Sequence, residues 1–168
     1  MVRALPSSRS LIRPARPDEA TSLAAAIPDE LTEAHAANRL REQELGYREV
    51  LVAEADGRLV GTVSMRETGF EVHSMHLFAL EVAPDHRGHG IGTSIVEHVV
   101  AEARRRGCER VYLEVRADNR ARRLYHRLGF RRVGRAFVNA WWQFRQDGSR
   151  ERIEELSYRM VKRLRPRG

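Results

Sequence analysis

The sequence of 168 residues contains one cysteine, Cys108, and one lysine, Lys162. A single cysteine cannot form a disulfide within the chain and is too few to build a zinc site by itself, so we interpret Cys108 as a small core residue in a reducing compartment. No apolar run approaches the roughly 20 residues that cross a bilayer. The opening residues, MVRALPSSRS, lack the apolar segment of a secretory signal. These absences predict a soluble, cytoplasmic protein with a short mobile lead-in at residues 1–8.

Positive charge is carried almost wholly by arginine and lies in the second half of the chain. Residues 101–168 hold 19 Arg and one Lys against 8 acidic residues, a net charge of +12, whereas residues 1–100 carry a net charge of −5. Basic surfaces bind the phosphates of nucleic acids, but no segment interleaves aromatic and basic residues as RNA-binding strands do. A nucleic-acid-binding module is therefore the weakest of the functions considered.

Hydrophobic patterning predicts one domain over residues 1–168, because 42% of the residues are hydrophobic and 32% are charged, as in globular proteins. Acids directly after Pro17 indicate the start of a helix, and an Asp56-Gly57 turn joins two apolar strands into a hairpin. The elements predicted for the first half are a strand at 9–16, a helix from 17, a helix at 29–45 and a hairpin at 48–67.

A run that is apolar on both faces, residues 75–84, predicts a central strand that Pro84 ends. The helix that follows from Ile91 carries an apolar stripe and is closed by Gly107. The remaining predicted elements are a strand at 108–117, a helix at 118–129 and two long strands around Asp147-Gly148. Strand, loop, helix and strand make a βαβ unit, so the central pair should be parallel with a right-handed crossover. The predicted fold class is α/β, with a mixed sheet of about seven strands flanked by helices.

The segment HRGHGIG, residues 86–92, places three glycines between the central strand and the helix. Glycines at the start of a helix leave several N–H groups open beside the positive end of the helix dipole, which suits a phosphate. The segment is neither a Walker loop nor a dinucleotide-binding fingerprint, and a simple tight turn is the alternative interpretation. His86 and His89 do not complete a metal site, which needs three or four converging ligands, so we expect no bound metal.

Residues 80–130 resemble the core of the GNAT superfamily of N-acetyltransferases. Arg87-x-x-Gly90-x-Gly92 matches the Arg/Gln-x-x-Gly-x-Gly/Ala signature of that superfamily, and LYHRLGF, residues 124–130, matches its second hallmark. The resemblance implies a GNAT fold whose parallel strand pair splays apart at the cofactor site. It also implies an enzyme that moves an acetyl group from acetyl-coenzyme A to a primary amine by direct attack.

By this resemblance, the backbone N–H groups of residues 87–92 bind the pyrophosphate of coenzyme A, and the pantetheine arm pairs with the strand at Leu80–Ala83. A main-chain N–H near Val82 is the implied donor to the tetrahedral oxyanion. Asn119 lies six residues before Tyr125, where the family pattern has seven. The implied cofactor-binding residues are Leu80, Val82, Arg87, Gly88, His89, Gly90, Ile91, Gly92, Thr93, Asn119 and Tyr125.

Tyr125 occupies the general-acid position of the family and is implied to protonate or hydrogen-bond the departing thiolate, although its spacing also fits a core tyrosine. The attacking amine must lose a proton, since a free alkylamine has a pKa of about 10. Glu114, then Glu81, then His76 are the candidate bases. Alternatively, Glu114 pairs with an arginine, Glu81 covers the sheet edge and His76 is a strand-end histidine.

The resemblance implies that the acceptor binds between the first two helices and the last strand pair, at residues 18–46 and 141–150. Acidic residues crowd the first of these segments: Asp18, Glu19, Asp29, Glu30, Glu33, Glu42 and Glu44. They predict a small cationic amine, since a negative surface concentrates cations, and two solvated helix faces are the alternative. A protein N-terminus or lysine is the second acceptor class. A non-catalytic sensor of acyl-coenzyme A is the alternative from another class of function, and a homodimer is the assembly considered.

Overall fold

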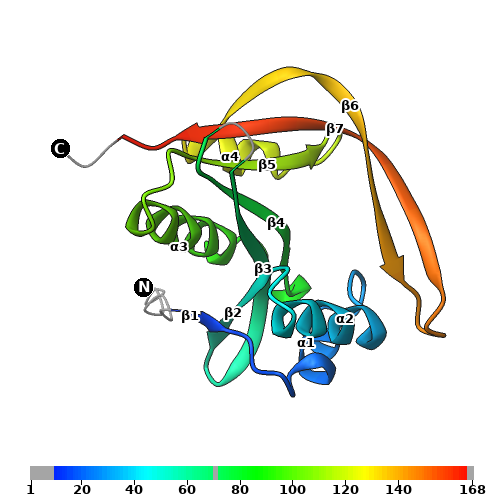
Figure 1. Cartoon of the computed structure of the whole chain (residues 1–168). Coiled ribbons are helices and arrows are strands. Elements are labelled where there is room, and N and C mark those ends of the chain that lie inside the picture. The colour runs from blue at the N-terminus through cyan, green and yellow to red at the C-terminus, as the bar shows by residue number, and fades with distance from the viewer. Residues whose placement is uncertain (1–9, 70–71, 166–168) are drawn as a thin grey trace, which may run out of the picture.

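The computed structural model describes residues 10–69 and 72–165, so the predicted lead-in at residues 1–8 lies outside the described residues. Strands and helices follow one another in the predicted order (Figure 1). The elements are β1 (Leu11–Pro14), α1 (Ala20–Ala26), α2 (Glu33–Glu44), β2 (Glu49–Ala55), β3 (Arg58–Thr68), β4 (Ser74–Val82), the 3₁₀ turn η1 (Pro84–His86), α3 (Ile91–Arg105), β5 (Arg110–Arg116), α4 (Arg122–Arg127), β6 (Arg131–Phe144) and β7 (Arg150–Arg163). Among the described residues, no helix is long and apolar enough to cross a membrane.

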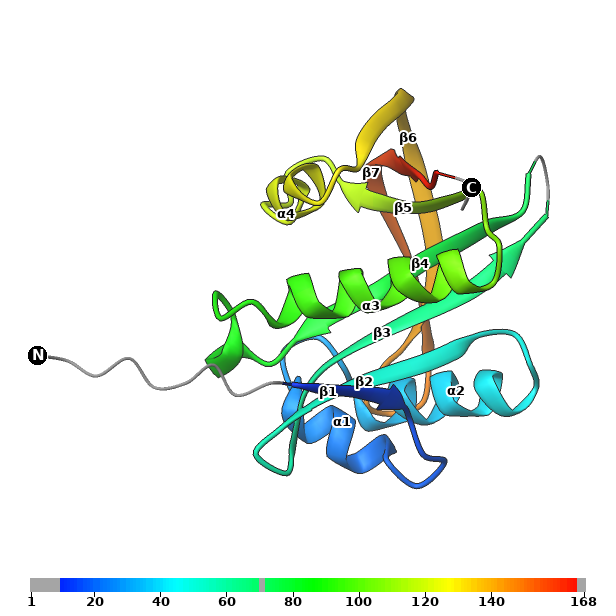
Figure 2. The same ribbon diagram turned by 90° about the vertical axis from the view of Figure 1, so that its left-hand side faces the viewer.

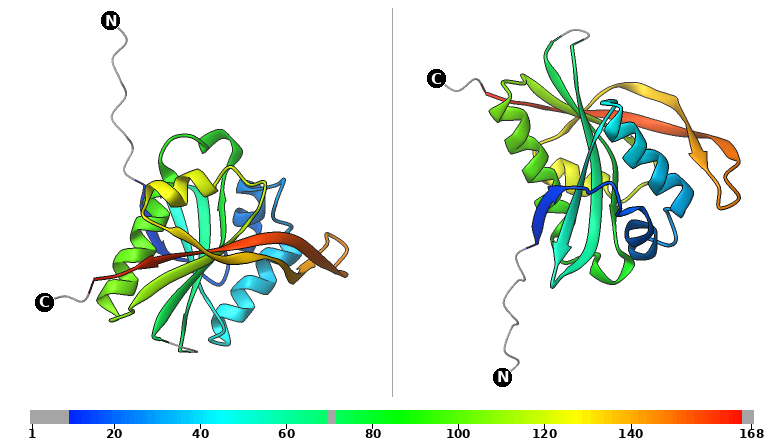
Figure 3. Two further views of the ribbon diagram at one scale, coloured as in Figure 1. Left: turned by 90° about the horizontal axis from the view of Figure 1, so that it is seen from above. Right: turned by 60° about the horizontal axis from the view of Figure 1, so that its bottom comes forward.

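Seven strands form one mixed sheet in the order β1-β2-β3-β4-β5-β7-β6. β4 and β5 are parallel, as the βαβ unit predicts, and the other neighbouring pairs of the described sheet are antiparallel. Helix α3 lies on one side of the sheet, while α1 and α2 lie on the other (Figure 3). The predicted α/β fold with a mixed sheet of seven strands is confirmed.

Two apolar clusters hold the helices against the sheet. The apolar stripe of α3 is buried against the central strands, as predicted, and consists of Ile95, Val96, Val99, Val100 and Ala103. Cys108 belongs to the same cluster, as expected for a small core residue. On the other face, Leu23, Ile27 and Leu40 of the α1–α2 region pack with β2. Each large aliphatic side chain so buried contributes about 1.5–3 kcal/mol of transfer free energy.

The parallel strands β4 and β5 pair over only a short stretch. Ser74–His76 pairs with Arg110–Tyr112, and beyond that point the two strands diverge (Figure 2). The register between β3 and β4 also shifts beside Ala79, whose φ is +53°. A positive φ in a non-glycine residue is strained, and such backbone concentrates at functional sites. Among the described residues, the β5-facing edge of β4 therefore has no strand partner after His76.

The β6–β7 hairpin connects the two helix layers. Near its tip, Thr32 Oγ1 donates to the Phe144 carbonyl over 2.9 Å, and the Phe144 N–H donates to His35 Nδ1 over 3.3 Å, which joins the hairpin to α2 (Figure 1). Toward its other end, Lys162 Nζ donates to the Leu128 carbonyl over 2.5 Å, at the end of α4. The hairpin, which forms the β7-β6 end of the sheet, thus contacts both α4 and the start of α2.

Candidate active site

The loop between β4 and α3 presents a row of backbone donors. Gly88 and Gly90 have φ values of +76° and +83°, and a Cβ added at either position would meet no atom within 4 Å. The N–H groups of residues 88–93 have no acceptor among the described residues, and α3 begins within this row, at Ile91. The positive end of the α3 dipole adds to these donors. The loop therefore has the chemistry of a phosphate site, the role expected for residues 87–92.

The side chains of Arg87 and His89 are engaged within this region. Arg87 Nε donates to the Val82 carbonyl over 3.1 Å, and one of its terminal nitrogens lies 3.2 Å from both Asp29 and Glu30. The exposed ring of His89 hydrogen-bonds the Arg87 carbonyl over 2.9 Å. The Arg87 guanidinium thus joins the loop to the end of β4 and to the α1–α2 connection. Its N–H donates to the Pro84 carbonyl over 3.4 Å, so the free donors begin at Gly88 rather than at residue 87 as expected.

Gly92 is the point at which three elements meet. A Cβ at this position would lie 3.4 Å from Leu124 Cδ2 on α4 and 3.9 Å from Val82 Cγ2 on β4. The missing side chain allows the start of α3 to approach α4 and the end of β4 closely. Gly92 thus brings the phosphate loop close to the end of β4 and to the helix that carries the predicted general acid, Tyr125.

The end of β4 directs main-chain groups into this opening. The Ala83 N–H donates to the Val60 carbonyl of β3 over 2.8 Å. Because successive residues of a strand direct their hydrogen-bonding groups to opposite sides, the Val82 N–H is directed away from β3, toward the side on which β5 has diverged. Leu80 and Val82 pack their half-buried side chains against the α3 cluster. The predicted pantetheine edge and oxyanion donor therefore face the same space.

Tyr125 is buried on α4, in edge-to-face contact with Phe130 at 5.9 Å between ring centroids. Its hydroxyl has no hydrogen-bond partner among the described residues, and burial raises its pKa above the usual value of tyrosine. The phenol is therefore protonated at neutral pH and has a hydrogen to donate. Both properties fit a general acid.

Asn119 forms the turn that precedes α4. Its Oδ1 accepts a hydrogen bond from the Ala121 N–H over 2.9 Å. Side chains of asparagine compete in this way with the first turn of a helix. The helix therefore begins at Arg122 rather than at residue 118, which corrects the predicted boundary. The side-chain carbonyl of Asn119 is used locally, and its amide nitrogen remains for a ligand.

His76 and Glu114 meet on the acceptor-facing side of the sheet. His76 Nε2 is 2.6 Å from Glu114 Oε2, and the imidazole stacks between the rings of Phe78 and Tyr112 at 4.8 and 4.6 Å. Arg159 donates to the other oxygen, Glu114 Oε1, over 3.2 Å, so Glu114 also pairs with an arginine, as the alternative interpretation had it. Burial alone would raise the pKa of Glu114, but hydrogen bonding to His76, together with the charge and hydrogen bond of Arg159, outweighs it, so the pKa is lowered. The two residues, which the sequence presented as alternative bases, thus form one hydrogen-bonded pair.

Glu81, the remaining candidate base, is bound by a residue that the sequence analysis did not single out. Arg39 of α2 donates to both Glu81 oxygens, over 3.2 and 2.5 Å, and both side chains are buried. Removal of one member of a buried ion pair leaves an uncompensated charge and is strongly destabilising. The only indication of this pair in the sequence was that Arg39 occupies a core-facing position of α2. The pair anchors α2 to β4, and it leaves Glu81 without a free oxygen for a substrate proton.

Most acids of the predicted acceptor region are paired with arginines. The pairs are Arg13–Glu19, Arg48–Glu42, Arg87–Asp29 and Arg87–Glu30. On the same face of the sheet, the guanidinium groups of Arg48 and Arg66 lie over the Phe78 ring at 4.9 and 5.3 Å. This surface therefore carries less unpaired negative charge than the composition of α1 and α2 suggests.

A parallel strand pair that splays beside a glycine-rich helix start is the arrangement by which acyl-coenzyme A-dependent acetyltransferases bind their donor, and it places the chain in that class. The sequence model of the acetyltransferase (GNAT) family matches residues 15–130, and the chain belongs to this family. The match includes the phosphate loop, the end of β4 and Tyr125. Members of the family use acetyl-coenzyme A as acyl donor.

Individual relatives agree with this assignment. An acetyltransferase of Pectobacterium atrosepticum is 38% identical over 71 residues, which cover 42% of this chain and 48% of that protein. N-alpha-acetyltransferase 40 of Saccharomyces cerevisiae is 47% identical over 67 residues, which cover 35% of this chain and 24% of that protein. The chain therefore spans less than half of the length of these curated relatives. Over the whole fold, the ribosomal-protein-alanine N-acetyltransferase of Brucella melitensis superposes with a TM-score of 0.65 at 27% identity, covering 92% of this chain and 99% of that one.

Proposed function

We propose that this protein is an N-acetyltransferase that moves an acetyl group from acetyl-coenzyme A to a primary amine. The observation that carries the proposal is the row of unbonded N–H groups at residues 88–93, beside the part of β4 that has no strand partner among the described residues. The row matches the needs of a pyrophosphate, and a free strand edge matches the amides of the pantetheine arm. Membership of the GNAT family supports the same donor.

Different residues near the end of β4 have different roles in the proposed reaction. Acetyl-coenzyme A, when bound, supplies a thioester carbonyl that a neutral amine attacks. The Val82 N–H is directed to the open side of β4, where it donates to the oxygen on which negative charge develops. A new C–N bond forms and the C–S bond breaks, so one proton must leave the nitrogen and one must reach the sulfur.

The His76–Glu114 pair is the proposed proton acceptor. The lowered pKa keeps the Glu114 carboxylate ionised at neutral pH, and its contact with His76 Nε2 fixes the tautomer of the imidazole. Glu114 then takes the proton of the amine directly or through a water molecule. Tyr125, a neutral phenol, donates its proton to the departing thiolate. Glu81 is not assigned a proton-transfer role, because both of its oxygens are held in a buried ion pair with Arg39, whereas the arginine that contacts Glu114, Arg159, is half-exposed.

The amino terminus of a polypeptide is the acceptor that we propose. This choice is supported by two relatives, the ribosomal-protein-alanine N-acetyltransferase of Brucella melitensis and N-alpha-acetyltransferase 40 of Saccharomyces cerevisiae. The small cationic amine that the acids of α1 and α2 predict has less support, since four of those seven acids are paired with arginine. It is kept as the second candidate.

An acceptor panel tests the proposal. The purified chain is incubated with acetyl-coenzyme A and one of three acceptors: peptides with a free amino terminus, the same peptides with a blocked terminus and an internal lysine, or a polyamine. Thiol release and product mass are measured. We expect the free amino terminus to give a kcat/KM at least about tenfold above the other acceptors. If the polyamine reacts fastest, the small cationic amine becomes the favoured acceptor class. If acetyl-coenzyme A binds tightly but no amine is acetylated, a non-catalytic sensor of acyl-coenzyme A is favoured.

A further inference from the structure

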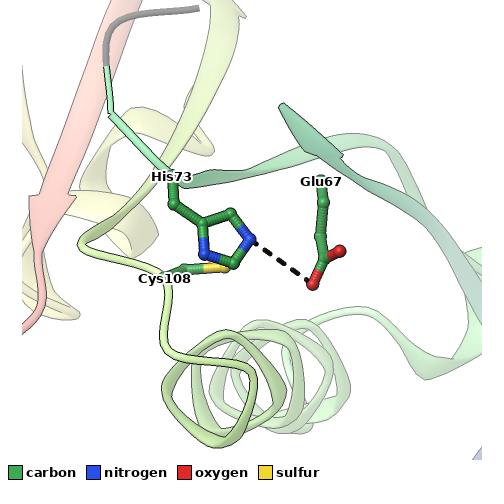
Figure 4. Close-up of side chains that lie close together, drawn as sticks. All are labelled: Glu67, His73 and Cys108. Atoms are coloured by element: carbon green, nitrogen blue, oxygen red, sulfur yellow. Dashed lines mark hydrogen bonds and ion pairs between the residues drawn. The ribbon is translucent and has the colours of Figure 1, made fainter. Parts of the chain in front are cut away.

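Three side chains with metal-binding atoms meet at the end of the sheet opposite the active site. Glu67 lies near the end of β3, His73 directly precedes β4 and Cys108 precedes β5 (Figure 4). His73 Nε2 is 3.7 Å from Glu67 Oε1 and 3.7 Å from Cys108 Sγ, and the three ligand atoms lie within 4.8 Å of one another. At 3.7 Å the His73–Glu67 ion pair is longer than a normal hydrogen bond, and the His73–Cys108 contact is a weak hydrogen bond to sulfur, so both contacts are loose.

The separations are close to those between ligands of one tetrahedral zinc ion. Zn–N and Zn–O distances of about 2.0–2.2 Å and Zn–S distances of about 2.3 Å place neighbouring ligand atoms roughly 3.3–3.6 Å apart. The two separations that involve His73 exceed this range only slightly, and the half-exposed Glu67 side chain is free to close the third. We propose that Glu67, His73 and Cys108 form a zinc site, with a fourth position left for water.

The ligand types select the metal. A thiolate and an imidazole suit zinc, whereas magnesium and calcium take oxygen ligands almost exclusively. Zinc binding displaces the thiol proton to solvent and pairs the cation with two anionic ligands. Zinc affinity should therefore rise with pH.

The surrounding charges permit this assignment. Arg106 lies close to the cluster, with Nη1 3.8 Å from Glu67 Oε1. Its guanidinium is bound more closely by Glu49, over 2.7 and 2.8 Å, and by Glu102, over 2.7 Å. Glu67 is therefore not the main partner of Arg106, and its carboxylate can turn to a metal ion.

The position of the site gives it a structural role. The Glu109 N–H donates to the His73 carbonyl over 2.8 Å, so the backbone already joins the two segments that carry the imidazole and the thiol. Directly beyond this bond, β4 and β5 make the short pairing that precedes their divergence. A bound zinc ion would fix the closed end of the strand pair, while acetyl-coenzyme A occupies the open end. The expectation of no metal, drawn from His86 and His89, considered only side chains that are neighbours in sequence.

Titration of the full chain without an affinity tag tests the site. Metal-free protein is titrated with Zn²⁺ in competition with a chromogenic chelator, and Co²⁺ reports thiolate coordination through its charge-transfer absorption. We expect one ion per chain, a higher thermal unfolding temperature with Zn²⁺, and an affinity that falls at least about 10²-fold in Cys108→Ser and His73→Ala. Glu67→Gln should weaken binding less, because the amide oxygen is an uncharged ligand.

Matched variants separate this site from incidental binding. His98→Ala, on the exposed face of α3, and Glu109→Gln, beside the cluster, should bind Zn²⁺ as the unmodified chain does. Circular dichroism checks that each variant folds. If Cys108→Ser unfolds, His73→Ala and Glu67→Gln still test the site, because they change half-exposed side chains. The proposal is overturned if the unmodified chain does not bind Zn²⁺, or if His73→Ala and Glu67→Gln bind Zn²⁺ as tightly as the unmodified chain does.

Discussion

The phenol of Tyr125 combines burial with a hydroxyl that has no hydrogen-bond partner among the described residues. The ring is packed in the core, but the hydroxyl oxygen is not among the fully buried polar atoms that lack a partner, so its proton is accessible to a ligand. The thiolate that leaves acetyl-coenzyme A would be such a ligand, because it needs a proton as the C–S bond breaks.

Replacement of this hydroxyl should separate chemistry from binding. In Tyr125→Phe, kcat should fall by about 10²-fold with little change in the KM for acetyl-coenzyme A, since the proton is donated only as charge develops. Thermal stability should stay close to that of the unmodified chain, because no hydrogen bond within the protein is lost. Steady-state kinetics and thermal unfolding measure both effects, with the exposed Tyr47→Phe as control. Full activity in a folded Tyr125→Phe variant would return the residue to a packing role.

Glu114 and His76 should act as one unit. Glu114→Gln preserves the size of the side chain but removes the proton acceptor, so kcat should fall by about 10²-fold. His76→Asn should give a similar loss, and the double variant should be no slower than the slower single variant, as expected for residues that act together. Glu154→Gln, an exposed carboxamide substitution on β7, is the control. Losses that add fully in the double variant would contradict the shared role.

The sequence predicted which polar residues lie near the reaction but not how they pair. Glu114, Glu81 and His76 were recognised because they are polar residues on otherwise apolar strands. Their partners lie 38 to 45 positions away, at His76, Arg39 and Arg159, and depend on strand register and on the docking of α2. No local pattern records such a pairing, so the choice between Glu81 and Glu114 required the structure.

The loop before α3 should need glycine at position 90 in order to bind acetyl-coenzyme A. Gly90→Val should lower the affinity for acetyl-coenzyme A at least about 10²-fold, because it strains a backbone with φ of +83° and places a branched side chain where a phosphate lies. Gly46→Val is the matched control, since Gly46 has a φ of +80° at the end of α2 with open space around it. Calorimetric titration measures both variants. Equal losses of affinity would show that backbone strain alone is responsible.

The junction between α2 and β6 should respond to pH. Burial, followed by the charges of Arg39 and Arg48, lowers the pKa of His35 to about 4, from an ordinary value of 6.5. Neutral His35 accepts the Phe144 N–H, so its contribution to stability is complete above pH 6.5 and is lost as the pH falls toward 4. Denaturant unfolding at a series of pH values should show this loss over that interval.

A non-titrating variant isolates the histidine. His35→Asn keeps an acceptor near the position of Nδ1 but cannot be protonated, so its stability should depend less on pH between 6.5 and 4. Carboxylates with lowered pKa values, such as Glu19 and Glu102, begin to lose their contribution as the pH falls through about 4.5, so the two proteins are compared between pH 6.5 and 4.5. Identical pH profiles for the two proteins would assign the effect to other groups.

Periodicity predicted the helices and strands, since alternation and an apolar stripe depend only on neighbouring residues. It placed α3 and its five buried stripe residues correctly. It did not predict the bulge at Ala79 or the point at which β4 and β5 separate, because both depend on how β3 and α4 pack on either side. The splayed pair entered the analysis only through the family resemblance, which the fold confirms.

The charge distribution of the whole molecule should be visible in the salt dependence of donor binding. The second half of the chain carries a net charge of +12, and three arginines at the start of α4 have no carboxylate partner among the described residues: Arg120, Arg122 and Arg123. All three line a surface cavity that also includes Asn119, one of the residues expected to bind the donor. Raising the ionic strength from about 0.05 M to about 0.5 M should raise the KM for acetyl-coenzyme A several-fold with little change in kcat. An unchanged KM would exclude electrostatic steering of the donor.

Lys162 is the only lysine in the sequence, and its Nζ is held against the Leu128 carbonyl over 2.5 Å. An enzyme that activates acetyl groups is exposed to modification of its own lysines, which lose their charge when acetylated. Here the positive surface is built from guanidinium groups, which remain protonated in proteins and are poor nucleophiles. The side chains therefore offer the donor almost no amine to modify, and the protein keeps its surface charge however much acetyl-coenzyme A accumulates around it.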